Sequence, residues 1–244
     1  MKFARTEVTT PAELAQRYEA APANESISEA LERSLGFAEA MIAAGHEDVL
    51  VGGIAPLYAS DRVANVQKAV AQARVAIAPS TEGRALIADA ERRFGAPLPP
   101  TLVALWEVLA SPRHRTWLRA FCVHSPVDPL HRDADAREPF TAEHAVWFAN
   151  AGCDRVSTPE KLARHEPGAF VMLDPALRES LISFARAPSE QWFVATGIAS
   201  DTYPAPVFSN HDDGEGQSEF HAGDVRAWFS QEISVSIAAV ISPA

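Results

Sequence analysis

Apolar residues recur every three or four positions along the first 80 residues, which is the spacing of one face of an α-helix. The first stripe follows a capping box from Ser26 to Glu29. A second stripe starts near Ser60, and the run Val49–Leu57 between them, with two glycines and a proline, predicts a connector. We expect these patterns to form an N-terminal helical subdomain or extension, residues 1–79.

A helix, a rigid corner and a second helix are predicted between Thr81 and Ala110. Thr81 can cap the first helix, and Pro97-Leu98-Pro99-Pro100 forms the corner. Each proline fixes its own φ and moves the residue before it out of the α region. Pro100 can still occupy the first turn of the second helix, where no backbone N–H is needed. Apolar residues of that helix recur at helical spacing: Leu102, Leu105, Trp106 and Leu109.

Beyond Ser111-Pro112, which closes this helix, the apolar runs become short and are bounded by Pro, Gly, Asn or Asp. Such runs predict strands. Helices followed by a strand-rich half predict an α+β fold, with a mostly antiparallel sheet packed with helices in residues 80–244. The expected extended runs are Trp117–His124, Ala145–Ala149, Ala169–Leu173, Gln191–Thr196 and Pro206–Ser209.

Four further segments complete this half. A short helix starts at Ser157–Glu160, with a proline in its first turn, and another covers Pro175–Phe184. Ala222–Phe229 predicts a late helix. The tail Ile233–Val240 alternates apolar and polar residues at first, so we expect a strand or an irregular packing segment.

Composition and hydropathy are those of a globular protein with a real core. Of the 244 residues, 47% are hydrophobic and 22% are charged. No apolar run approaches the roughly 20 residues of a membrane span, and no signal peptide is visible. Two cysteines make no disulfide framework and predict free thiols. We therefore expect a cytoplasmic protein that does not bind membranes.

The net charge is −11 and is unevenly distributed. Residues 141–244 carry 14 acidic and 6 basic side chains, a net charge of −8. Such a surface repels phosphate backbones and excludes nucleic acid as the expected partner. It would attract a basic protein and speed the encounter. The alternative is that the charge only keeps the protein soluble.

Three segments between about residues 82 and 232 resemble the SUKH superfamily of bacterial immunity proteins. Arg93–Pro100 and the helix after it are similar to the family's opening helix, Leu-Pro corner and second helix. Arg155–Leu162 is similar to its step from a strand to a short helix. Pro206–Gly214, with Phe220 and Asp224–Phe229, resembles its late strand, acidic hairpin and final helix. The resemblance implies a bacterial immunity protein that binds and neutralises a toxin, without cofactor or chemistry of its own.

The acidic turn near residue 212 is the main candidate for chemistry or binding. The chain has no Gly-x-Ser-x-Gly, P-loop, Cys-x-x-Cys or His-Glu-x-x-His motif. His211, Asp212, Asp213 and Glu215, with His221 and Asp224 nearby, contain imidazole and carboxylate groups of the kind that hold divalent metals. A metal-dependent enzyme using this His211–Asp224 cluster is one alternative. The others are an acidic hairpin turn shaped by its backbone, and a loop that contacts a basic toxin.

We predict no catalytic residue and no metal site, and we assign the cluster to partner binding. Asp212, Asp213, Glu215 and Glu219 would steer a basic toxin. Trp192 and Trp228, expected to be partly exposed, would supply buried contacts in the complex. Cys122 and His124 would face the same side of a strand, without a third group that makes a nucleophile. A protein-interaction scaffold on the same fold, unrelated to toxins, remains a further alternative.

Overall fold

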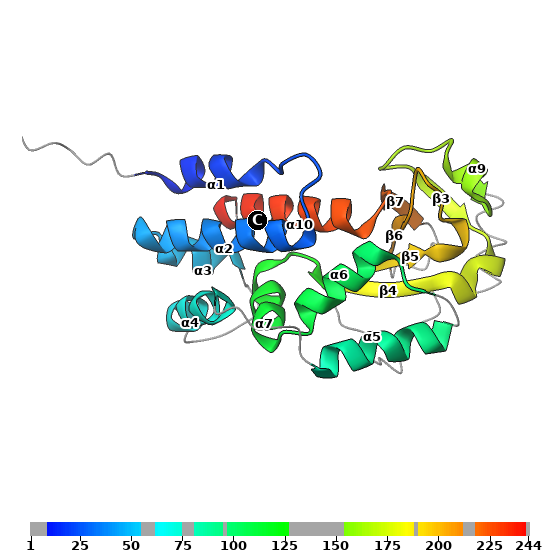
Figure 1. The fold of residues 1–244 in the computed structure, drawn as a ribbon. Helices are drawn as coiled ribbons and strands as arrows, with labels where there is room; N and C mark the ends of the chain where they lie inside the picture. The colour runs from blue at the N-terminus through cyan, green and yellow to red at the C-terminus, as the bar shows by residue number, and fades with distance from the viewer. Residues whose placement is uncertain are drawn as a thin grey trace, which may run out of the picture.

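A computed structural model describes residues 9–54, 62–74, 81–94, 97–126, 154–187, 190–211 and 218–242. In this part of the chain a seven-stranded sheet lies beside a group of helices (Figure 1). The combination confirms the predicted α+β class. No helix of the described ranges is long and apolar enough to cross a membrane.

The sheet has the order β1-β4-β5-β6-β7-β3-β2. Neighbouring strands are antiparallel except β2 and β3, so the sheet is mostly antiparallel as predicted. Three predicted extended runs correspond to β3, β5 and β6, whereas Ala145–Ala149 lies outside the described residues. The strands are β1 Ser125–Pro126, β2 Arg155–Val156, β3 Phe170–Leu173, β4 Leu181–Ala187, β5 Glu190–Ala195, β6 Val207–His211 and β7 Ser218–Ala222.

Local signals placed most of the helix starts correctly. Ser26 and Glu29 form the predicted capping box of α2, and Pro100 occupies the first turn of α6. Thr158 caps the short helix α9. The helices are α1 Pro11–Glu19, α2 Ile27–Ala43, α3 Glu47–Ile54, α4 Arg62–Arg74, α5 Thr81–Phe94, α6 Pro100–Leu109, α7 Pro112–Phe121, α9 Pro159–Leu162 and α10 Val225–Ile241, with 3₁₀ turns η1 Pro175–Ser180 and η2 Thr196–Ile198.

Three local predictions were wrong. The expected connector Val49–Leu57 is helical as far as Ile54, and burial of Leu50 and Val51 stabilises the helix in spite of its glycines. The expected strand Trp117–His124 begins inside α7, whose N-cap is Ser111 and which buries Trp117, Leu118 and Phe121 on one side. The expected helix Pro175–Phe184 is a 3₁₀ turn followed by β4, which starts at Leu181.

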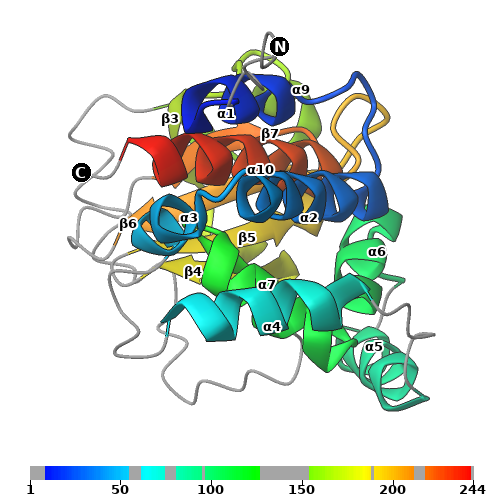
Figure 2. The ribbon, with the colours of Figure 1, turned by 90° about the vertical axis from the view of Figure 1, so that its left-hand side faces the viewer.

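The C-terminal tail was also assigned wrongly, since α10 continues through Ile233–Val240 as a helix. It contacts α1, α2, α3, α6 and β7, and lies among the helices in both ribbon views (Figures 1 and 2). Only the narrow stripe of Ala227, Gln231 and Val235 is exposed along its length. A helix buried on nearly all sides has no amphipathic pattern, so its serines produced a misleading alternation.

The sheet separates two hydrophobic cores. The larger core joins the helices to one face of the sheet, and it includes Leu35 of α2, Trp117 of α7 and Ile233 of α10. The helices before residue 79 therefore share a core with those after it. The smaller core covers the opposite face and contains Phe193, Phe208 and Phe220, among others.

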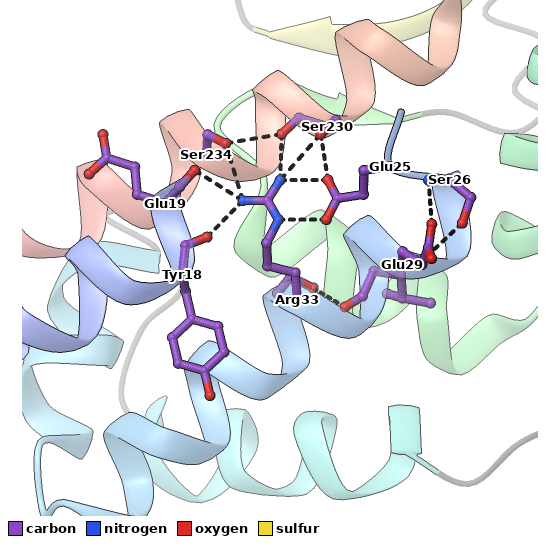
Figure 3. A network of polar contacts seen from close by, with 10 residues as sticks. Tyr18, Glu19, Glu25, Ser26, Glu29, Arg33, Ser230 and Ser234 are labelled. Carbon is purple, nitrogen blue, oxygen red and sulfur yellow. Dashed lines mark hydrogen bonds and ion pairs between the residues drawn. The ribbon is translucent and has the colours of Figure 1, made fainter. Parts of the chain in front are cut away.

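A buried ion pair holds the N-terminal helices to α10 (Figure 3). Arg33 of α2 binds Glu25 with its Nε 2.7 Å from Oε1, and the two side chains are 8% and 1% exposed. The same guanidinium donates to backbone carbonyls at the end of α1 and to Ser230 and Ser234 of α10. This network fixes the position of α10, one face of which forms the site described below.

Candidate functional site

A cleft of about 360 Å³ opens between α10 and the face of the sheet that α10 covers. Three of the six residues predicted to bind a partner meet there: Trp192 of β5, Glu219 of β7 and Trp228 of α10. The other three, Asp212, Asp213 and Glu215, lie outside the described residues. The full lining is His124, Trp192, Glu219, His221, Trp228, Gln231, Glu232 and Val235.

The strand register explains how the sheet side of the cleft is assembled. Trp192 of β5 pairs with Ser209 of β6, which pairs with Glu219 of β7. Residues opposite one another on neighbouring strands point to the same face. Because side chains alternate along a strand, Phe193 and Phe220 point into the smaller core. The strands therefore present Trp192, Glu219 and His221 to the cleft, while Phe193 and Phe220 face the smaller core.

The helix side of the cleft comes from one face of α10. Trp228, Glu232 and Val235 are four and three residues apart, and so lie on the same side of the helix. Val235 is 42% exposed at the rim, whereas Glu232 is 3% exposed inside. The cleft thus has an apolar rim and a buried carboxylate.

The segment that follows α7 supplies hydrogen-bond partners for the Glu232 carboxylate. Its Oε1 accepts the His124 backbone N–H at 2.8 Å and the Ser236 hydroxyl at 3.1 Å, and its Oε2 lies 2.7 Å from Nδ1 of His124. Ser236 also accepts the backbone N–H of Val123. These partners are needed because an unpaired buried carboxylate is costly. Glu232 therefore positions His124 against the wall of the cleft.

Aromatic rings form the floor. The His124 and Trp192 ring centroids are 4.1 Å apart, and the Trp192 and Trp228 centroids are 6.3 Å apart. Phe184 meets Trp228 edge to face at 4.8 Å. Trp192 and Trp228 are only 1% and 4% exposed, so the expectation that they are partly exposed was wrong. They are buried because both belong to the core between α10 and the sheet.

Ser209, His221 and Glu219 have the composition of a catalytic triad but not its geometry. The Ser209 hydroxyl lies 2.7 Å from Nε2 of His221, while Nδ1 of His221 is 3.9 Å from Glu219. That second distance exceeds a hydrogen bond, so Glu219 does not orient the ring as a triad carboxylate does. Ser209 is also fully buried, so a substrate cannot reach its oxygen. The arrangement fixes the imidazole and leaves Glu219 facing the cleft.

The Cys122 thiol lies close to Glu232 but is not poised for reaction. Burial raises the pKa of Cys122 well above its ordinary value, and the negative charge of Glu232 adds to this effect. The thiolate is the nucleophilic form, so this environment opposes reactivity. The prediction that Cys122 and His124 share one side of a strand was wrong, since α7 ends at Phe121 and Cys122 is its C-cap.

Within the described ranges, no group of three or more His, Cys, Asp or Glu side chains is arranged to hold a metal ion. Asp224, a member of the alternative metal cluster, is the N-cap of α10 and accepts the Ala227 backbone N–H at 2.7 Å. It also lies 3.4 Å from Arg226. Asp224 therefore has a structural explanation, as the cap of a helix.

Sequence reasoning missed Glu232 and Val235, and it considered His124 only as a partner of Cys122. One signal was available, since Glu232 is the only charged residue in the apolar C-terminal stretch after Arg226. A carboxylate in a buried helix implies a partner elsewhere in the chain. No protein-family model, curated protein or solved structure matches the chain. The likeness to the SUKH superfamily therefore stays a prediction.

Proposed function

We propose that the protein is a bacterial immunity protein that binds a basic toxin and neutralises it in the cytoplasm, without chemistry of its own. The cleft carries this proposal. Its lining contains two carboxylates and, in the described structure, no lysine or arginine. A partner with a basic surface complements such a site.

The acidic segment with Asp212, Asp213 and Glu215 supports the same assignment. It joins the end of β6 to the start of β7, where Asn210 pairs with Ser218. Glu219 of the cleft is the next residue of β7. Asp212, Asp213 and Glu215 thus precede Glu219 by only a few residues in the chain, and we expect their field to steer a basic protein towards the cleft.

Binding, rather than catalysis, also agrees with how the polar groups of the cleft are used. Glu232 is engaged by His124 and Ser236, and the Ser209 hydroxyl is buried against His221. A binding protein needs only a complementary surface with a few well-buried anchors. Such a surface would cover the active site of the toxin.

Co-expression with the neighbouring gene tests this function. An immunity gene lies directly beside its toxin gene, so the neighbouring product should arrest growth alone and be harmless when this protein is present. The two proteins should also elute as one complex in size-exclusion chromatography. A neighbour that is harmless alone, or toxic in spite of this protein, would refute the proposal and favour a scaffold unrelated to toxins.

Charge reversal tests the steering role. A variant with Asp212→Lys, Asp213→Lys and Glu215→Lys should associate with the toxin at least about tenfold more slowly at low salt, with a weaker salt dependence. The matched control reverses three exposed carboxylates elsewhere, at Glu107, Glu166 and Asp201. Equal association rates for the two variants would remove the acidic turn from the mechanism.

A further inference from the structure

We infer that the cleft between α10 and the sheet receives an arginine side chain of the partner. The inference rests on the proposed function in one respect, since it assigns the arginine to the bound toxin. The cleft itself, its charge and its aromatic floor are properties of this chain alone. They specify a planar organic cation better than an anion or a neutral group.

Charge is the first reason. The ionisable groups facing the cleft are His124, Glu219, His221 and Glu232. Glu232 is already bonded to His124 and is 3% exposed, whereas the Glu219 side chain is 27% exposed. Glu219 therefore remains the carboxylate that an entering cation can reach. An anion would meet the Glu219 carboxylate and no lysine or arginine among the described lining residues.

Shape is the second reason. In the floor, the rings with surface open to an entering group are His124 and His221, whose side chains are 26% and 22% exposed and which lie beside the buried Trp192. A guanidinium is planar, stacks on aromatic surfaces and binds a carboxylate through two parallel N–H groups. Lysine offers a compact, strongly hydrated charge that matches this floor less well. At the rim, the exposed Val235 offers apolar surface to the methylene stem of an arginine.

Burial is the third reason. The cleft is large enough for one long side chain, and its polar edge is completed by the exposed residue Gln231. A charged group that enters a partly desolvated site must find a counter-charge there. Glu219 supplies it. One arginine thus becomes a buried anchor of the kind that dominates interface affinity.

The first test uses Nα-acetyl-arginine amide as the probe. It should shift the indole NMR signals of Trp192 and Trp228 saturably at millimolar concentration. Nα-acetyl-citrulline amide, which has nearly the same shape without the charge, should bind at least about tenfold more weakly. Equal binding of the two probes, or shifts confined to other residues, would overturn the inference.

Two variants connect the probe to the cleft. Glu219→Gln should weaken binding of the arginine probe about tenfold or more. Glu166→Gln, at an exposed residue that does not line the cleft, should leave it unchanged. Val235→Arg tests the same point without touching Glu219. Because Val235 is 42% exposed the variant should fold, and its own guanidinium should block the probe. Unchanged binding in both variants would exclude this cleft.

Binding measurements with the toxin distinguish a failure of this inference from a failure of the proposed function. If the neighbouring gene product is neutralised but Glu219→Gln and Val235→Arg bind it as tightly as the wild type does, the inference fails and the function stands. If no neighbouring toxin exists, the function fails whatever the probe does. If both variants lose at least about tenfold in affinity for the toxin, both statements are supported.

Discussion

Removing one partner of the buried Arg33–Glu25 pair should cost more stability than removing one partner of an exposed ion pair, and Glu25→Gln is the change that tests it. Arg33 binds both carboxylate oxygens of Glu25, at 2.7 and 2.8 Å. It also donates to the carbonyls of Tyr18 and Ser230, each at 2.8 Å. The last carbonyls of a helix lack intrahelical partners, so Arg33 completes the end of α1 as well as binding α10.

The expected magnitude follows from burial. The two side chains are 8% and 1% exposed, so the guanidinium in Glu25→Gln would stay buried without its counter-charge. Breaking a buried pair on one side costs about 3–5 kcal/mol, against a typical total stability of about 5–15 kcal/mol. Arg33→Gln leaves the buried Glu25 carboxylate without its counter-charge, so we expect a loss of stability of similar size. Exposed ion pairs are worth at most about 1 kcal/mol, so Arg92→Gln, in a pair where Arg92 is 74% exposed, is the matched control.

Urea unfolding followed by tryptophan fluorescence measures these costs, because Trp117 and Trp228 belong to the core that the pair supports. The double variant Glu25→Leu/Arg33→Met removes both charges together. Since no buried charge is left unpaired, it should lose less than the sum of the two single variants. Proteolysis should also cut α1 faster in Glu25→Gln than in the wild type, because α1 loses its attachment to α10.

Two results would refute this reasoning. One is a loss in Glu25→Gln no larger than that in Arg92→Gln, which would mean that water already compensates the pair. The other is a double variant whose loss equals the sum of the single losses, which would mean that Arg33 and Glu25 act independently.

Three further predictions concern single residues. Asp224→Ala should cost about 1 kcal/mol in urea unfolding through loss of the α10 cap, while Asp224→Asn, an equally good cap, should cost much less; equal losses would argue against capping. In a Cys153→Ser background, Cys122 should not react with a thiol reagent at pH 8 until the protein unfolds, because burial raises its pKa; rapid modification of the folded protein would contradict this. A backbone N–H, and secondarily Arg155, lowers the pKa of Asp174 below its ordinary value of 3.8. Because the pKa of Asp174 is lower in the folded than in the unfolded state, this stabilisation is present above about pH 4 and is lost as the pH falls through the folded pKa. Asp174→Ala should therefore flatten the pH dependence of the free energy of unfolding below about pH 4, and an unchanged slope would contradict this.

Short-range chemistry made much of the fold predictable. The capping box at Ser26 and the proline at the start of α6 act within one helical turn, so the chain shows them without its partners. Strands β5 and β6 were visible for a similar reason. Their residues alternate between two faces, and turn-forming residues bound them.

The site was only partly predictable. Glu219, Trp192 and Trp228 were named from charge and residue type, and the structure brings them into one cleft. Sequence reasoning could not say that the two tryptophans form its floor. Burial depends on what packs against a residue, and α10 supplies that cover from the far end of the chain.

Taken by itself, the amino-acid sequence determined the α+β class, the helix pair around its proline corner and the acidic character of the C-terminal part, because each depends on local pattern or composition. Tertiary structure decided the rest. The contact between His124 and Glu232 spans 108 positions, and the Arg33 contact with Ser230 spans 197. Such contacts arise from packing one almost wholly buried helix against both the N-terminal helices and the sheet. The sequence predicted only the first part of that helix, as Ala222–Phe229. Since burial on nearly all sides erases helical periodicity, its second part, which contributes Glu232 and Val235 to the cleft, was missed.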